Sequence, residues 1–299
     1  MNQKIILLTA ISMALTACSK EELFTGQNKD VELSVDVKSK NETATKAIIK
    51  ETYLPDKATI GLVVEAAAGG NYDGISYNNI PYTATGTGNG QKWDTSSSVL
   101  LSSTIGKVYA YYPYSSSVTD ITKIPVSTEN TVDYMYAEPV TGISNNSPVA
   151  KINMKHALAA IGVKVLKGTY TGSANMTTIS IASQGFGSSG MLDAITGTLE
   201  DIQNTGSDIT WTGNIPLSVE TETIMQTVIP TTLENQNISF KVIIDGQSYT
   251  TTKAIEGVLR QGNIYEYTLT LNGTEMRISS TTVTKWVTNT GNGGELETE

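Results

Sequence analysis

Apolar and polar side chains alternate strictly in Val31-Glu32-Leu33-Ser34-Val35-Asp36-Val37-Lys38. A two-residue period of this kind predicts a β-strand that buries one face and exposes the other. The same alternation recurs in five later stretches, at residues 152–154, 161–165, 179–181, 238–244 and 265–271. After Cys18, no stretch keeps the 3.6-residue apolar period long enough for a major helix. We therefore expect an all-β chain.

Turn-forming residues separate these stretches, in Gly/Asn/Asp/Pro-rich clusters at residues 68–71, 86–90, 145–148, 245–246 and 272–273. Many short strands joined by hairpin turns are typical of β-sandwiches. The cluster at residues 144–148 is the best internal boundary, and it predicts two sandwich domains in tandem, 47–148 and 149–299. One exception to strand is expected at residues 154–160, where Lys-His-Ala-Leu-Ala-Ala favours a single helical turn.

Charge and scarce residue types exclude several classes of function. The 299 residues carry 20 Lys+Arg and 29 Asp+Glu, a formal net charge of −9. A chain this acidic, with Arg260 and Arg277 as its two arginines, cannot neutralise a row of phosphates, so we expect no nucleic-acid partner. A single Cys excludes a disulfide framework and a cysteine-based zinc site, and a single His excludes any site that needs two imidazoles. We expect no catalytic residue, no metal and no cofactor.

The first 17 residues have the layout of an export signal. Lys4 precedes an apolar run, and small residues precede Cys18. The run is about a dozen residues where a transmembrane span needs roughly twenty, which favours a signal peptide over a membrane anchor. Residues 15–18, Leu-Thr-Ala-Cys, also resemble the lipobox of bacterial lipoproteins. That resemblance implies cleavage between Ala17 and Cys18, acylation of Cys18, and attachment of the chain to a membrane.

Residues 18–46 differ in character from the rest of the chain. Residues 19–22, Ser-Lys-Glu-Glu, resemble the acidic tag that sends lipoproteins of Bacteroidales to the outer face of the outer membrane. The strand pattern at 31–37 is followed by a polar run, 38–46, that contains three lysines. This segment is either a lipid tether with an ordinary first strand, or a strand followed by a link that a protease can reach.

Three further motifs are better explained by structure than by chemistry. Residues 185–190 match the glycine spacing of a dinucleotide-binding loop but lack the long helix that must follow, which favours a hairpin or loop. His156 is a candidate general base, although a lone histidine before an apolar strand is more typical of a hydrogen-bonded packing residue. Tryptophans of a β-sandwich more often fill the core than bind glycans; here they are Trp93, Trp211 and Trp286.

Six stretches follow one another along nearly the whole mature chain: ATIGLVV at 58–64, VYAYYPY at 108–114, VDYMY at 132–136, MKHALAAIGV at 154–163, GNIYEYTL at 262–269 and VTKW at 283–286. Their order and spacing resemble the fimbrillin family, the pilin subunits and relatives of the type V pili of Bacteroidales. The resemblance implies a lipoprotein precursor with two tandem transthyretin-like β-sandwich domains.

The resemblance also implies a route of maturation. In polymerising members a trypsin-like protease cuts after a basic residue ahead of the N-terminal domain, which here is the bond between Lys46 and Ala47. The strand before the cut then leaves, and the groove accepts a strand from a neighbouring subunit. Burial of the four side chains on the departing face corresponds to about 6 to 12 kcal/mol before entropy is subtracted; they are Val31, Leu33, Val35 and Val37.

Donor candidates lie near the C-terminus, at Ile278, Val283 and Val287, although these residues could equally form the last strand of the second domain. The implied partners are other pilin subunits, bound by β-strand addition, the outer membrane, the maturation protease, and a host glycan or protein ligand. The implied location is the cell surface, first as an outer-membrane lipoprotein and then in an extracellular pilus (fimbrium) that serves adhesion. The alternative is a non-polymerising anchor, tip or surface adhesin that keeps its N-terminal strand.

Overall fold

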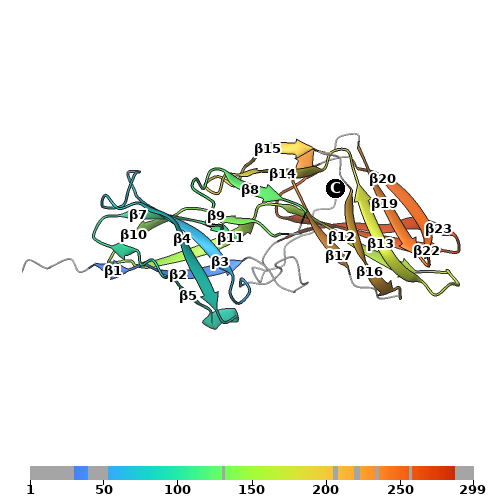
Figure 1. Ribbon diagram of the computed structural model, residues 1–299, viewed down its shortest axis with the longest axis horizontal. Coiled ribbons are helices and arrows are strands. Elements are labelled where there is room, and N and C mark those ends of the chain that lie inside the picture. The colour runs from blue at the N-terminus through green and yellow to red at the C-terminus, as the bar shows by residue number, and fades with distance from the viewer. Residues whose placement is uncertain are drawn as a thin grey trace, which may run out of the picture.

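The computed structural model describes residues 30–39, 53–129, 132–204, 208–218, 223–232, 236–255 and 258–286. Within these ranges every regular element is a β-strand except one short 3-10 turn, Gly88–Gly90. The expectation of an all-β chain is therefore confirmed. Figure 1 shows an elongated molecule in which two groups of strands follow one another along the long axis.

An eight-stranded sheet forms the N-terminal group. Its end strands, β2 and β5, approach within 8 Å between Cα atoms, so the sheet curves into a near-barrel around an apolar core. A two-stranded pair, β1 (Val31–Glu32) and β6 (Leu100–Leu101), adjoins it. The order of the large sheet is β2 (Ser34–Ser39), β11 (Val149–His156), β9 (Met135–Ala137), β7 (Gly106–Tyr112), β3 (Thr59–Ala66), β4 (Tyr77–Thr85) and β5 (Lys92–Asp94), with β10 (Val140–Ile143) also paired to β7.

Two four-stranded sheets form the C-terminal group and enclose a second apolar core. Phe240 and Tyr267 meet across it, with ring centroids 4.9 Å apart, one ring from each sheet. A short pair, β18 (Thr231–Thr232) and β21 (Val258–Leu259), lies outside both sheets. The first sheet has the order β17 (Ile224–Val228), β12 (Ala159–Lys167), β22 (Asn263–Asn272), β23 (Glu275–Lys285), and the second β16 (Ile209–Pro216), β13 (Asn175–Ala182), β19 (Gln236–Ile244), β20 (Gln247–Ile255).

A three-stranded sheet lies between the two groups: β8 (Ile124–Ser127), β14 (Gly187–Leu192) and β15 (Leu199–Asn204). It contributes Leu192 of β14 to a third apolar cluster, which also contains Tyr111 of β7 and Ile229, the residue directly after β17. Strand β8 precedes residue 148 and pairs with β14, which follows it, while β11 begins at residue 149 and belongs to the eight-stranded sheet. The division into 47–148 and 149–299 stays a prediction.

The helical turn expected at residues 154–160 is wrong. Strand β11 continues to His156, Ala157 and Leu158 form a bend, and β12 begins at Ala159. Both β11 and β12 take part in parallel pairing, with β2 and β22 respectively. Strand β11 still alternates exposed and buried residues, but every residue from Ala157 to Val163 is buried, as in a parallel strand covered on both faces, so the sequence there is a continuous apolar run. Tertiary burial of residues 156–163, at the corner between the two sheets, therefore overrides the helix propensity of the alanines.

Candidate functional site

The N-terminal segment 31–39 changes hydrogen-bonding partner in its middle. Strand β1 pairs antiparallel with β6, and the Leu33 amide donates to the Val99 carbonyl at 2.9 Å. The Ser34 amide then donates to the Pro148 carbonyl at 2.9 Å, and β2 runs parallel to β11 as far as Met154. The single strand expected over 31–37 is thus two short strands joined at Leu33. By switching partners, the segment ties β6 to the end of the eight-stranded sheet.

The alternation seen in the sequence does orient the side chains of the segment. Leu33 and Val37 are 2% and 1% exposed and belong to the core of the near-barrel, whereas Val31 and Val35 are half-buried. The intervening Glu32, Ser34 and Asp36 are exposed. Because two large side chains rather than four are fully buried, their burial corresponds to about 3 to 6 kcal/mol before entropy.

Two tyrosines of β4 form hydrogen bonds with the segment and with its partner strand β6. The Tyr82 hydroxyl donates to the Leu33 carbonyl at 3.3 Å, and the Leu100 amide donates to the Tyr77 hydroxyl at 3.3 Å. Burial raises the pKa of Tyr82 to about 12, so the hydroxyl remains a donor over the whole physiological range. The sequence held no signal for these contacts, which join residues far apart in the chain.

At the C-terminal end of the segment, a buried polar group lacks a hydrogen bond. Ser39 is fully buried, and its hydroxyl has no hydrogen-bond partner among the described residues. A buried unpaired hydroxyl destabilises a fold by about 1 to 3 kcal/mol. The segment is therefore well packed at Leu33 and Val37. At Ser39, where the polar run that contains the predicted cleavage bond begins, a buried hydroxyl lacks a hydrogen bond.

Several predicted site residues lie outside the described residues. These are the lipidation and signal-cleavage positions Ala17 and Cys18, the maturation bond Lys46–Ala47, and the donor candidate Val287. The other donor candidates lie in β23, where Ile278 is half-buried opposite Leu269 and Val283 is 52% exposed opposite Tyr265. In this structure they form the last strand of the C-terminal group, the second of the two readings left open by the sequence.

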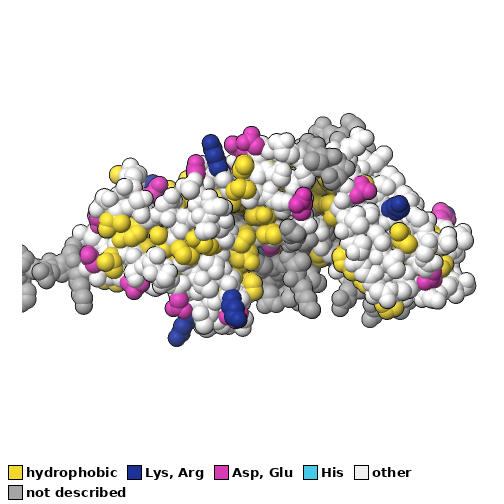
Figure 2. All heavy atoms as spheres, viewed as in Figure 1, with side chains coloured by type: hydrophobic (Ala, Val, Ile, Leu, Met, Phe, Trp, Pro, Cys, Tyr) yellow, Lys and Arg dark blue, Asp and Glu magenta, His cyan; other side chains and the backbone are white. Residues whose placement is uncertain are grey.

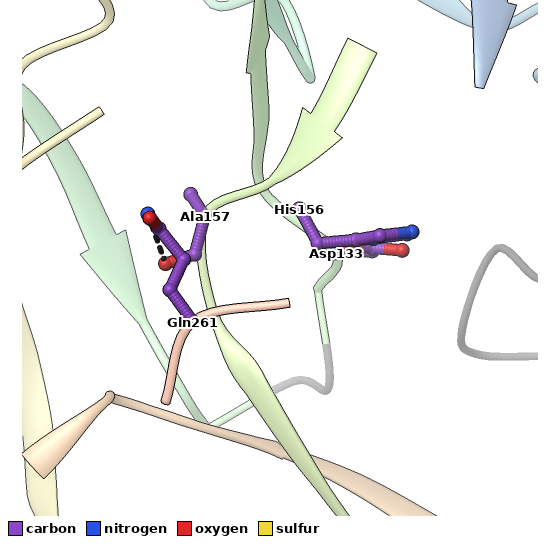
Figure 3. Close-up of polar contacts among 4 residues, drawn as sticks. All are labelled: Asp133, His156, Ala157 and Gln261. Atoms are coloured by element: carbon purple, nitrogen blue, oxygen red, sulfur yellow. Dashed lines mark hydrogen bonds and ion pairs between the residues drawn. The ribbon is translucent and has the colours of Figure 1, made fainter. Parts of the chain in front are cut away.

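His156 is a buried packing residue. Its Nδ1 lies 2.9 Å from Asp133 Oδ1, and both side chains are almost fully buried. The imidazole stacks on the indole of Trp286, with ring centroids 3.9 Å apart and planes 12° from parallel. Figure 3 shows His156 and Asp133 side by side, with Gln261 reaching the adjacent Ala157. Sequence reasoning missed the roles of Asp133 and Gln261, since nothing local to either residue indicates its distant partner.

The described ranges hold no cluster of three or more His, Cys, Asp or Glu side chains that could bind a metal ion. In the same ranges no helix is long and apolar enough to cross a membrane. The glycine-rich stretch 185–190 runs from a turn into β14, as expected of a loop or hairpin, and a strand rather than a helix follows it. In the described ranges, the features that remain as candidates for function are packing surfaces and the edges of sheets.

Solved structures share this fold at low sequence identity. A candidate cell-adhesion protein of Bacteroides ovatus matches with a TM-score of 0.66 and 17% identity over 87% of this chain and 99% of its own. One of Bacteroides uniformis matches with a TM-score of 0.64 and 19% identity over 86% and 99%. A fimbrial protein of Bacteroides vulgatus matches with a TM-score of 0.52 and 13% identity over 87% and 100%. At these identities the likeness establishes the fold alone.

The family is established by sequence. No curated protein sequence matches the chain significantly. The fimbrillin-like family model matches residues 45–286, which is most of the chain and includes both strand groups apart from β1 and β2. The resemblance carried by the six stretches above is thereby confirmed. The chain belongs to the fimbrillin-like family.

Proposed function

We propose that this chain is a structural pilin subunit, matured by cleavage after Lys46 and assembled by donor-strand exchange into a surface fimbrium that serves adhesion. One observation carries the proposal: the segment 31–39 closes the near-barrel as its end strand and fills its core with Leu33 and Val37. Membership of the fimbrillin-like family supports a structural rather than an enzymatic role.

Removal of this segment would leave an incomplete barrel. The edge of β11 from Val149 to Met154 would lose its parallel partner, and β6 would lose β1. The position now filled by Val37 would become an apolar pocket beside the β11 edge, and that filled by Leu33 a second pocket beside Val99 and β6. A groove with backbone groups on its edge and alternating pockets is the form that an incoming strand fills by β-strand addition.

The finer steps of the proposal come from the sequence. Export would end with cleavage after Ala17 and acylation of Cys18, which tethers the precursor to the outer membrane. A trypsin-like protease would then cut between Lys46 and Ala47, ahead of two transthyretin-like domains. The donor strand would come from the C-terminal region of a neighbouring subunit, and its candidate residues are Ile278, Val283 and Val287.

An adhesive surface is the remaining part of the proposal. Figure 2 shows apolar side chains gathered at the surface of the N-terminal group, while backbone and side chains that are neither apolar nor charged cover most of the C-terminal group on the same face. Exposed large apolar side chains of the N-terminal group include Ile75, Leu100 and Ile105, at 51%, 47% and 50% exposure. Such residues suit contact with another pilin subunit or a host glycan or protein ligand.

Fibre formation on the native cells tests the proposal. In the Lys46→Ala variant we expect residues 18–46 to be retained and fibres to disappear from electron micrographs. Lys40→Ala is the matched control, because it removes a lysine from the same polar run but leaves the proposed cleavage bond intact. Fibres of unchanged abundance in the Lys46→Ala variant would exclude this bond as the trigger.

The second candidate is an anchor, tip or surface lipoprotein adhesin that keeps its first strand. The observation in its favour is that the segment is hydrogen-bonded to both β6 and β11, as a permanent part of the barrel would be. Mass spectrometry of protein sheared from cells separates the two. An N-terminal peptide that begins at Ala47 supports the polymerising subunit, and one that begins at acylated Cys18 supports the anchor or adhesin.

A further inference from the structure

The last strand among the described residues, β23, is attached mainly by its backbone. Strand β23 pairs antiparallel with β22 along its length and lies at the end of its four-stranded sheet. Of its 11 residues only Met276 is buried, Ile278 and Thr284 are half-buried, and the others are exposed. A strand with so few buried side chains contributes little to the core, so apolar packing at its ends is a large part of what its side chains add to the backbone pairing.

Trp286 holds the far end. This residue follows β23 directly, is 3% exposed, and packs in a small apolar cluster with Ala160, Met225 and Ile264. These three residues lie on β12, β17 and β22, so each of the other three strands of the sheet contributes a residue to the cluster that contains the indole. The Trp286 amide also donates to the Gly262 carbonyl at 2.5 Å. The end of β23 is thus pinned by one large side chain and one backbone hydrogen bond.

The N-terminal group provides the surface against which the indole stacks. His156 lies at the end of β11, and its ring is parallel to the indole at a centroid distance of 3.9 Å. Asp133, from the loop before β9, fixes the orientation of the imidazole through the 2.9 Å contact to Nδ1. The ring pair therefore connects the last strand of the C-terminal group to the eight-stranded sheet.

The turn before β22 provides a second connection at the same place. Gln261 Nε2 donates to the Ala157 carbonyl at 3.0 Å and to the Gly197 carbonyl at 2.8 Å. The Gly262 amide donates to the Leu158 carbonyl at 2.9 Å. Figure 3 shows Gln261 and His156 on opposite sides of the bend at Ala157. This second connection holds the bend that follows His156 without using the side chain of Trp286.

We propose that Trp286, His156 and Asp133 form a latch that retains β23 in its own subunit. While the latch is closed, β23 stays paired with β22. When it opens, the strand keeps its backbone hydrogen bonds, the side chains of Met276 and Ile278, and the exposed hydrogen bonds made by Ser279 and Thr281. If donor-strand exchange takes place as proposed above, the latch prevents β23 from leaving before assembly. This last consequence rests on the proposed function, whereas the latch itself does not.

Hydrogen exchange of the full chain tests the latch, with amide exchange of β23 measured in wild type, Trp286→Ala, His156→Ala and the double variant. We expect β23 exchange to rise about tenfold in Trp286→Ala, because the stack and the end cluster are both lost. His156→Ala should show part of that rise. The double variant should exchange no faster than Trp286→Ala alone, since the two side chains act through one contact.

Trp211→Ala is the matched control, because Trp211 packs against the core of the same group from the opposite sheet. It should leave β23 exchange within about twofold of wild type. Trp286→Phe keeps an aromatic ring and should give an intermediate rise, which makes the test independent of how well Trp286→Ala folds. Unchanged β23 exchange in both Trp286 variants would overturn the latch. Fibre counts on native cells are a separate readout, so absence of fibres in wild type would overturn the proposed function and leave the latch standing.

Discussion

The two terminal strands of the described chain lie at sheet ends but are held in opposite ways. The segment formed by β1 and β2 has short pairings with two different strands, and Leu33 and Val37 are buried in the core. Strand β23 has one long antiparallel pairing, and its side chains are mostly exposed. The first is attached chiefly by side chains, the second chiefly by backbone and by Trp286 beyond its end.

This difference determines what the loss of each strand would do. Loss of the N-terminal segment opens the near-barrel and exposes core positions, which only another strand with matching side chains can fill. Loss of β23 would expose a strand edge but little of the apolar core. The groove left by the N-terminal segment is therefore suited to select the strand that fills it. The edge of β22, in contrast, is suited to release β23 once the latch opens.

The largest expected effect is that of a charge on the buried face of the segment. Val37→Asp places an unpaired carboxylate in the core of the near-barrel and should destabilise it by about 4 kcal/mol or more. The measurement is hydrogen exchange of β3 and β7, which lie in the middle of the eight-stranded sheet. Asp36→Asn, on the exposed face of the same strand, is the control. Equal protection in the two variants would contradict the assigned orientation of the segment.

A pair of truncations compares the two terminal strands directly. Leu33→Ala should destabilise the near-barrel by about 2 to 5 kcal/mol, because it leaves a cavity where a fully buried leucine was. Val283→Ala, at an exposed position of β23, should change stability by less than about 0.5 kcal/mol. Urea unfolding of the two variants gives the comparison. A loss at Val283 as large as that at Leu33 would show that β23 is also held by its side chains.

Much of this fold could be predicted from alternation, and the exceptions have a physical cause. The stretches 161–165, 238–244 and 265–271 are strands, as expected, because each has one face on a core. The error at residues 154–160 arose where the chain passes from β11 to β12 and is buried continuously from His156 to Val163, so that no alternation is visible. The partner switch at Leu33 and the stack of His156 on Trp286 depend on distant residues, and no local pattern encodes them.

A buried tyrosine in each group permits a comparison at alkaline pH. Burial raises the pKa of Tyr82 and of Tyr267 to about 12, above the ordinary value of 10. As the pH rises through 10, the unfolded tyrosine loses its proton first, so stability that is complete below pH 10 is lost progressively toward pH 12. Tyr82→Phe should reduce this loss in the near-barrel only, as followed by hydrogen exchange of each group between pH 9 and 12. It should not abolish the loss, because burial also raises the pKa of Tyr109, Tyr111 and Tyr112 in β7. An unchanged alkaline loss in the near-barrel would show that Tyr82 is not one of its sources.

The smallest expected effect concerns the weakly satisfied end of the segment. Ser39→Ala removes a buried hydroxyl that has no partner among the described residues, and it should stabilise the near-barrel by about 1 kcal/mol. Ser34→Ala, at an exposed position of the same strand, is the matched control and should have almost no effect. If the segment must leave for assembly, the more stable Ser39→Ala variant should release it more slowly after cleavage at Lys46. Destabilisation by Ser39→Ala in urea unfolding would instead show that the hydroxyl is hydrogen-bonded. The segment would then be well held at its C-terminal end as well as at Leu33 and Val37.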